Sequence, residues 1–264
     1  MRRLQLFELE DLPWFPAPVR DAGTDFLRFM LTVGDNYAPV APLLARALRD
    51  SGAPRVVDLC AGGGGPWRRM LPALAAEGLT CDVLLTDRFP NPASVDGLLA
   101  ELGHTGRLSY HRQPVDALAV PAELAGFRTL FSALHHFAPP AATALLRDAV
   151  LQGAPIGVFE STQRNATSIV AVLFAPLLML LVTPLIQPFR WSRLLLTYLV
   201  PLVPLMVLWD GLVSCLRSYT VAELEALVAG IPEAESYVWQ VGEIAGRGPI
   251  PVTYLIGVPK GGIQ

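Results

Sequence analysis

The order of apolar and polar residues divides the chain into four parts. Residues 1–50 begin with an aromatic, proline-broken stretch and continue with apolar positions at helical spacing, which predicts an N-terminal helical cover. Over residues 51–167 short apolar runs alternate with amphipathic stretches, as in a core of strands and helices. Residues 168–209 are almost continuously apolar and predict a helical insertion, and residues 210–264 return to the mixed pattern of the core.

Strands that alternate with helices predict a parallel sheet with right-handed crossovers. The last two apolar runs, residues 236–244 and 252–260, are joined by a Gly- and Pro-rich connection and favour an antiparallel hairpin. Before them, Thr220 and Glu223 have the spacing of a helix capping box. The expected fold class is therefore α/β: a Rossmann-like, mostly parallel sheet with an antiparallel C-terminal hairpin, an N-terminal helical cover and an apolar helical insertion.

Composition narrows the function classes. The chain has 264 residues, 52% of them hydrophobic and only 16% charged, which excludes intrinsic disorder. A formal net charge of -3 provides no basic excess for a phosphate backbone, so no nucleic-acid partner is expected. Three scattered cysteines and the absence of clustered His, Cys, Asp and Glu spacings predict neither a disulfide framework nor a metal site. The few cysteines and the absence of a signal-peptide pattern in the first residues favour a cytoplasmic setting, and the preference for Arg over Lys indicates bacterial codon bias.

The segment with the most chemical information is residues 55–67, where a strand pattern containing Asp58 leads into Gly62–Gly65 and then a helix pattern. Glycine permits positive φ and close approach of a cofactor to the backbone at a helix N-terminus. The phosphate loop of nucleoside triphosphatases requires Lys followed by Ser or Thr, which are missing here. A dinucleotide site usually lacks an acid just before its first glycine, whereas Asp58 precedes this loop. A tight turn without a ligand remains the alternative.

This arrangement resembles the class I S-adenosylmethionine (SAM)-dependent methyltransferases. Their first motif has an acid followed by Gly-x-Gly-x-Gly, and residues 56–64, VVDLCAGGG, match it with Cys60 at the first glycine position. A small residue suffices there if φ is negative. The resemblance covers residues 55–165 and, in outline, 218–260.

The resemblance implies a set of cofactor contacts. Asp87 ends the second expected strand, where the family's acid binds the ribose hydroxyls, and a carboxylate can accept two hydroxyl donors at once. Asp116 stands where members of the family often have an acid or amide that binds the adenine amino group. For both Asp87 and Asp116, a solvent-exposed acid without a ligand is the alternative. The full set of expected SAM-binding residues is Asp58, Cys60, Ala61, Gly62, Gly64, Asp87, Arg88, Asp116 and Ala117.

Candidates for the chemistry follow the fourth and fifth expected strands. Methyl transfer is an in-line displacement that depends on alignment of the acceptor, and a base is needed only if the acceptor must lose a proton. His135 or His136 could be that general base, although packing or capping is the alternative. Asp210 is a further catalytic candidate and Glu160 a substrate-binding one; a buried ion pair, for Asp210 with a partner such as Arg217, is the competing interpretation for both.

The apolar insertion, residues 168–209, indicates where the substrate is found. Its apolar runs, Ile169–Ile186 and Leu194–Trp209, are short for spanning a bilayer and are interrupted by prolines. A monotopic hairpin would place Arg190, Trp191 and Arg193 at headgroup level on the cytoplasmic side of a membrane; a buried cap or dimer interface is the alternative.

Either arrangement would give the site an apolar wall and favour a lipid, quinone or isoprenoid-like acceptor. Trp14, Phe15 and Tyr37 could line the acceptor pocket from the N-terminal side, or pack in the core. The expected function is SAM-dependent methylation of an apolar, membrane-resident small molecule. The alternatives are a catalytically degenerate membrane-associated binding protein and a nicotinamide-dependent oxidoreductase.

Overall fold

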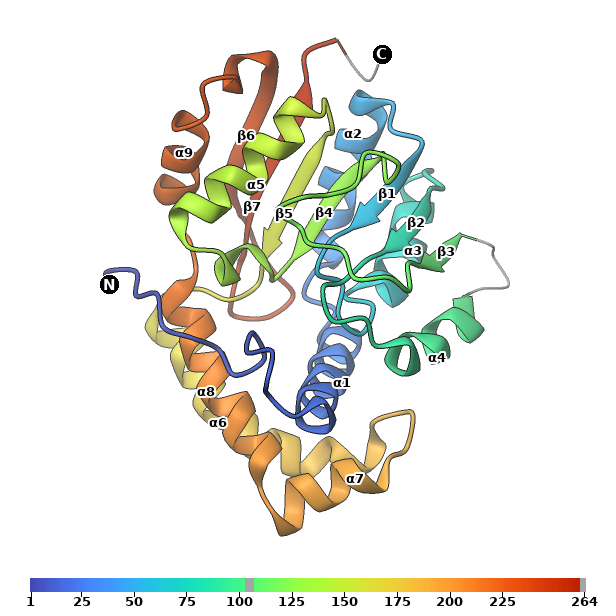
Figure 1. The fold of residues 1–264 in the computed structure, drawn as a ribbon, viewed down its shortest axis with the longest axis vertical. Coiled ribbons are helices and arrows are strands. Elements are labelled where there is room, and N and C mark those ends of the chain that lie inside the picture. The colour runs from blue at the N-terminus through green and yellow to red at the C-terminus, as the bar shows by residue number, and fades with distance from the viewer. Residues whose placement is uncertain (103–106, 262–264) are drawn as a thin grey trace.

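A seven-stranded sheet forms the centre of the computed structural model, which describes residues 1–102 and 107–261 (Figure 1). The strand order is β3-β2-β1-β4-β5-β7-β6, and β7 runs antiparallel to both β5 and β6. The α/β fold expected from the sequence is therefore confirmed. The strands are β1 (Arg55–Asp58), β2 (Asp82–Leu85), β3 (Leu108–Tyr110), β4 (Phe127–Phe131), β5 (Ile156–Glu160), β6 (Tyr237–Ile244) and β7 (Val252–Pro259).

Helices cover both faces of the sheet because successive strand residues point to opposite sides. Val56 lies in the hydrophobic core under one layer of helices, and its neighbour Val57 lies in the core under the other. The first layer contains α2 (Ala41–Ser51), α3 (Trp67–Ala76) and α4 (Pro92–Leu102), and the second contains α5 (Pro139–Leu151) and α9 (Val221–Ala229). The predicted capping box between Thr220 and Glu223 is present at the start of α9.

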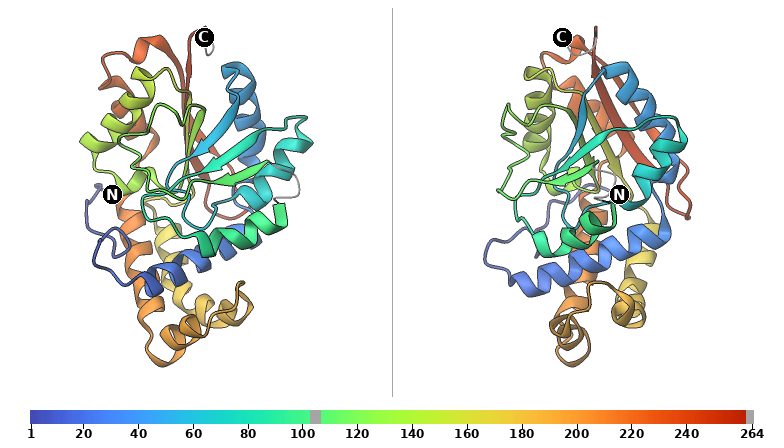
Figure 2. Two further views of the ribbon diagram at one scale, coloured as in Figure 1. Left: turned by 45° about the vertical axis from the view of Figure 1, so that its right-hand side comes forward. Right: turned by 90° about the vertical axis from the view of Figure 1, so that its right-hand side faces the viewer.

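The N-terminal cover differs from the expectation, because only part of it is helical. Residues 1–16, which we call the N-terminal strap, contain neither helix nor strand. The first helix, α1 (Ala17–Gly34), crosses beneath the carboxyl ends of the parallel strands (Figure 2). The second, α2, packs against the sheet as part of the core. The cover of the carboxyl edge therefore consists of the strap and α1.

The apolar insertion is a helical hairpin that projects beyond α1, away from the sheet (Figures 1 and 2). It comprises α6 (Ala166–Val182), the 3-10 turn Thr183–Leu185, α7 (Trp191–Leu194), the π-helical turn Leu195–Leu199 and α8 (Leu202–Arg217). It thus extends past both ends of the expected residues 168–209. Met179 of α6 and Val203 and Met206 of α8 share a small core with Phe26 of α1, which fixes the hairpin to the rest of the chain.

One continuous helical segment of the hairpin, Ala166–Leu185, is long and apolar enough to cross a membrane, and 17% of its most apolar window is buried within the protein. Residues 191–199 and 202–217 meet the same criterion only when taken together, and they are bent by 78° at the break between them. By length and composition alone, the hairpin could either span a membrane or lie on its surface.

One of the two arginines of the insertion does not lie where the monotopic arrangement predicts it. Arg193 is buried, and its guanidinium donates to Asp25 of α1 at 2.6 Å. Arg190 lies 3.6 Å from the same carboxylate. The expected headgroup position is wrong for Arg193, because the buried Asp25 carboxylate needs a cationic partner inside the protein. Trp191, in contrast, is 77% exposed.

Candidate active site

The glycine turn joins β1 to α3 at the carboxyl edge of the sheet. Gly62 and Gly64 have φ of +53° and +102°, and a Cβ on Gly64 would lie 2.4 Å from Cδ2 of Leu98. The backbone conformation at residue 64 therefore favours glycine, and a side chain there would also displace the Leu98 side chain. Cys60 has φ +56°, so the condition under which a small side chain would fit this position without strain, a negative φ, is not met. A left-handed conformation costs a residue with a Cβ about 1–2 kcal/mol, and such strain is typical of functional turns.

Asp87 holds this turn against the end of β2. Its carboxylate accepts the backbone N–H of Gly62 at 2.8 Å and that of Phe89 at 2.7 Å. Burial raises the pKa of Asp87, and these two hydrogen bonds oppose that shift. The acid therefore connects the glycine turn to the segment after β2, a contact that the linear spacing of the two motifs does not specify.

Asp58, the acid before the glycines, faces the interior rather than a cavity. It is 1% exposed and accepts hydrogen bonds from Nε1 of Trp67 at 2.7 Å and Oγ1 of Thr129 at 2.6 Å. Burial raises the pKa of Asp58 to about 7. Asp58 thus fixes the start of α3 and the neighbouring strand β4 around the turn.

The raised pKa of Asp58 predicts a pH-dependent stability. Because the folded chain binds a proton that the unfolded carboxyl loses near its ordinary pKa of 3.8, the free energy of unfolding should fall as pH rises from about 4 to about 7, by roughly 2–4 kcal/mol. Asp58→Asn should reduce the total loss by the share of Asp58 and leave that of Asp210, whose pKa is also raised to about 7, whereas Asp50→Asn, at an exposed ion pair on α2, should not change it. Thermal unfolding of the three proteins between pH 5 and pH 8 measures the difference, and parallel curves for wild type and Asp58→Asn would contradict the assignment.

A cavity of about 530 Å³ opens at the carboxyl edge beside these residues. Six of the expected cofactor residues line it: Cys60, Ala61, Asp87, Arg88, Asp116 and Ala117. Gly63 and Gly65 line it in place of Gly62 and Gly64. The opposite wall comes from the strap and α1, with Glu10, Asp11, Arg20, Asp21 and Thr24 among its residues. The volume falls in the range of small-molecule sites.

The expected acceptor residues lie outside this cavity lining. Tyr37 is buried, and its hydroxyl is 2.6 Å from Oγ of Ser132, which does line the cavity. Phe15 packs against the core shared by α1 and the hairpin, and Trp14 is 73% exposed. No residue of the hairpin is among those that line the cavity in the described part of the chain. The apolar wall expected from the insertion is therefore not part of this cavity, because α1 lies between the two.

The two histidines occupy different environments on the 3-10 turn Leu134–His136 after β4. His136 lines the cavity, and its Nδ1 is 2.9 Å from Asp11 Oδ1. Glu8 and Asp11 raise the pKa of His136 to about 10 despite its burial. This charge disfavours the expected role of His136 as a general base near neutral pH. His135 is buried behind the cavity wall, with Nδ1 2.6 Å from Oε2 of Glu160.

Glu160 and Asp210 both have structural partners. Glu160 accepts the backbone N–H groups of Ala133 and Leu134, and burial opposed by His135 leaves its pKa lowered. Asp210 accepts the N–H groups of Leu9 and Glu10 at 2.7 and 3.2 Å, and burial raises its pKa to about 7. Neither carboxylate is among the residues that line the cavity.

Arg217, the ion-pair partner expected for Asp210, pairs with two other acids instead. Arg217 pairs with Glu8 at 3.2 Å and with Asp11 at 2.9 Å. These two acids come from the strap and were not candidates in the sequence, because nothing in its local pattern distinguishes them from solvent-exposed acids.

Comparison with known proteins identifies the fold. No protein-family model and no curated protein sequence matches this chain. The plantazolicin methyltransferase BpumL, solved in complex with SAH, matches with a TM-score of 0.59 at 12% identity, over 96% of this chain and 94% of that one.

Further solved structures with TM-scores above 0.5 include the following two proteins. The O-methyltransferase NcsB1 from neocarzinostatin biosynthesis, in complex with SAM and 2-hydroxy-5-methyl naphthoic acid, matches with 0.53 at 18% identity over 92% of this chain and 59% of that one. The pyocyanin biosynthetic protein PhzM matches with 0.52 at 17% identity over 87% and 56%. The chain thus spans little more than half of these two proteins. It has the fold of the class I SAM-dependent methyltransferases, as its first motif indicated.

Proposed function

We propose that this chain is a SAM-dependent methyltransferase that works at a membrane surface and methylates an apolar small molecule held in the bilayer. The observation that carries the proposal is the cavity at the carboxyl edge, where the glycine turn and Asp87 meet residues 116–117. The shared fold and the SAM or SAH bound in similar structures support the same cofactor here.

The residues at the cavity fit SAM. A carboxylate offers about four acceptor positions, and the Gly62 and Phe89 N–H groups occupy two of those on Asp87. The remaining two suit the two hydroxyls of a ribose. Phe89, whose ring lies 4.6 Å beneath the guanidinium of Arg20, and Asp116 with Ala117 would receive the adenine. Gly63 and Gly65 add no side chain to the wall, which leaves room for the methionine part.

When bound, SAM supplies an electrophilic methyl group, and the chain contributes position and exclusion of water. The turn after β1 is fixed from two sides, by Asp87 and by the interior contacts of Asp58, so the cofactor site is organised before binding. The strap and α1 close the cavity opposite the turn, and this closure would hold an acceptor atom in line with the methyl group.

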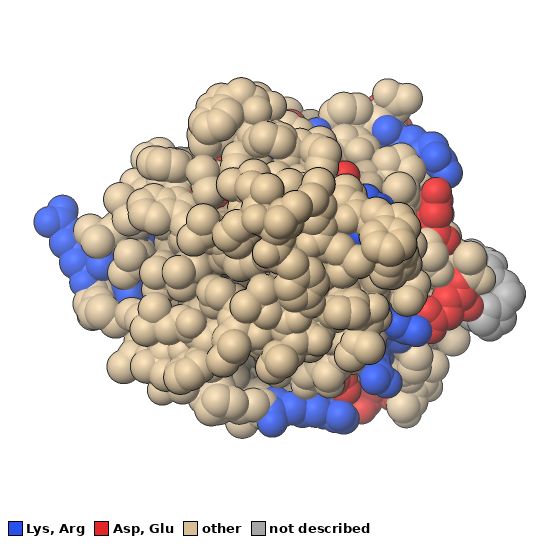
Figure 3. All heavy atoms as spheres, turned by 90° about the horizontal axis from the view of Figure 1, so that it is seen from below, with Lys and Arg blue, Asp and Glu red and all other residues tan. Residues whose placement is uncertain are grey.

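The apolar face of the hairpin supports action at a membrane. Seen from below, an almost uninterrupted surface without charged side chains covers this end of the molecule, with charged residues at its edge (Figure 3). Phe174, Leu181, Trp191 and Leu199 are 62–77% exposed on it. Exposed apolar patches of this extent indicate an interaction site, and Trp and Tyr, here Trp191 and Tyr198, are typical of the membrane interface. We assign a lipid bilayer as its occupant.

A second hollow supports delivery of the acceptor from that side. It has a volume of about 590 Å³ and reaches Leu185, Gln187 and Pro188 of the hairpin. Arg28 and Gly65 line both this hollow and the cavity at Asp87, so the two adjoin. A molecule leaving the bilayer beside the hairpin would therefore reach the glycine turn between α1 and α4.

The decisive experiment incubates the purified protein and methyl-labelled SAM with bacterial membrane lipid extract and analyses the extract by mass spectrometry. The proposal predicts a product heavier than an extract component by one labelled CH2. Retention of SAM without transfer to any lipid would favour the binding-protein alternative, and tighter binding of a nicotinamide dinucleotide than of SAM would favour the oxidoreductase.

A further inference from the structure

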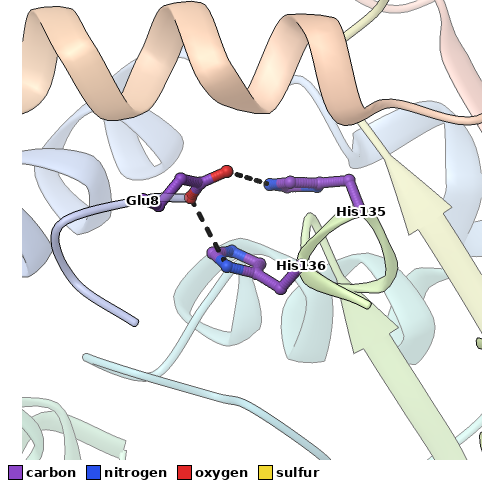
Figure 4. A group of neighbouring side chains, drawn as sticks. All are labelled: Glu8, His135 and His136. Carbon is purple, nitrogen blue, oxygen red and sulfur yellow. Dashed lines mark ion pairs between the residues drawn. The ribbon is translucent and has the colours of Figure 1, made fainter. Parts of the chain in front are cut away.

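We propose that a divalent transition-metal ion binds between Glu8, His135 and His136 and fastens the N-terminal strap to the turn after β4 (Figure 4). The three side chains come from two segments far apart in the sequence. The proposal does not depend on the methyltransferase function, since it concerns how the strap is held.

The carboxylate of Glu8 lies between the two imidazoles. Oε1 is 3.9 Å from Nε2 of His135, and Oε2 is 3.4 Å from Nδ1 of His136. One ligand atom from each of the three side chains lies within 4.8 Å of the other two. Ligands around a tetrahedral zinc ion are about 3.4 Å apart, given metal-ligand distances of 2.0–2.2 Å. Small side-chain rotations therefore bring all three atoms to one ion.

His135 is oriented as metal-binding histidines usually are. Its Nδ1 is 2.6 Å from Glu160, whose other oxygen accepts the N–H groups of Ala133 and Leu134. With Nδ1 donating to a fixed carboxylate, the lone pair of Nε2 is on the side that faces Glu8. A carboxylate that receives the second nitrogen of a ligating histidine fixes the tautomer and raises the basicity of the ligand.

Oε2 of Glu8 faces the protonated imidazole of His136, whose Nδ1 is 3.4 Å away, and a metal ion would take the place of that proton. Glu8 is 0% exposed, and its Oε2 accepts no hydrogen bond within the described part of the chain. A buried carboxylate oxygen without a hydrogen bond is costly. Asp11 and Asp210 add further negative charge nearby, while Arg217 contacts the other oxygen, Oε1, at 3.2 Å. An ion at Oε2 would compensate this charge and replace the proton that His136 shares with Asp11.

Two imidazoles and one carboxylate are a ligand set that suits zinc and its first-row neighbours rather than magnesium or calcium. The ion would lie behind the cavity wall, because Glu8 and His135 are buried and only His136 reaches the cavity. Its effect would be to add a strong contact to the hydrogen bonds from Arg3 of the strap to the carbonyls of His135 and Phe137.

The test uses the full-length protein, stripped with a chelator and titrated with Zn²⁺ and, separately, Co²⁺. We expect one ion per chain with micromolar or tighter affinity, and a visible Co²⁺ spectrum typical of nitrogen and oxygen ligands. Glu8→Gln and His135→Gln should each weaken Zn²⁺ binding at least 10-fold, and His111→Ala, a histidine outside the cluster, should leave it unchanged. Binding below one ion per chain, or equal binding by wild type and the cluster variants, would overturn the proposal.

A measurement on the wild-type protein covers the case in which a variant does not fold. Hydrogen exchange of residues 2–12 should slow at least 10-fold when Zn²⁺ is added, while exchange in β6 should not change. Equal exchange of the strap with and without Zn²⁺ would show that the ion does not fasten it. Because neither readout involves SAM or methyl transfer, failure here and failure of the proposed function are distinguishable.

Discussion

Replacing Asp87 with alanine is expected to weaken SAM binding by about 10- to 150-fold, or 1.5–3 kcal/mol, through loss of charged hydrogen bonds to the ribose. The structure adds a second contribution, because Asp87 also holds the N–H of Gly62 and thereby the shape of the glycine turn. Isothermal titration of the purified protein with SAM measures the change.

Asp82→Ala is the matched control for this variant. Asp82 lies at the opposite end of β2 and forms an exposed ion pair with Arg107 at 3.0 Å, so its loss should change SAM affinity by less than about 2-fold. Equal affinity of wild type and Asp87→Ala would place the cofactor elsewhere and remove the main support for the proposed function.

The core of the fold could be predicted from the sequence because its signals are local. Strand and helix patterns alternate from residue 55 onward. Asp58 ends β1, and Asp87 lies two residues beyond the end of β2, which pairs with β1 in parallel. Thr220 caps α9 as its spacing with Glu223 indicates. Parallel strands bring their carboxyl ends to one edge, so Asp87 and the glycine turn meet there.

Contacts between distant segments could not be predicted in this way. Glu8 lies in an irregular strap, and its position beside His135 depends on how that strap folds back over the sheet edge. Arg193 has the local context of a membrane-surface residue, yet the buried Asp25 of α1 determines where it lies. Cys60 has a positive φ, which is usual for glycine and uncommon for cysteine. The residue type at position 60 therefore gave no indication of this backbone conformation.

Four substitutions on the apolar face of the hairpin, Phe174→Gln, Leu181→Gln, Trp191→Gln and Leu199→Gln, are together expected to lower binding to lipid vesicles by about 10²–10³-fold. Each large side chain moved from water into the bilayer interface contributes at least about 0.7–1 kcal/mol. Cosedimentation with vesicles of phosphatidylcholine and phosphatidylglycerol measures the partition coefficient. Point substitutions are preferable to deletion of the hairpin, because Met179 and Met206 cover Phe26 of α1.

The control for these substitutions is the pair Leu151→Gln and Val238→Gln, which changes residues that are 62% and 50% exposed on α5 and β6, away from the hairpin. It should leave vesicle binding unchanged within about 3-fold, and SAM affinity should be the same in all variants because no hairpin residue lines the cavity at Asp87 within the described ranges. Light scattering after size exclusion tests the alternative that the apolar face is a dimer interface. If the wild-type chain is a dimer, and the four substitutions make it a monomer without affecting vesicle binding, the apolar face is a protein interface and the bilayer assignment is wrong.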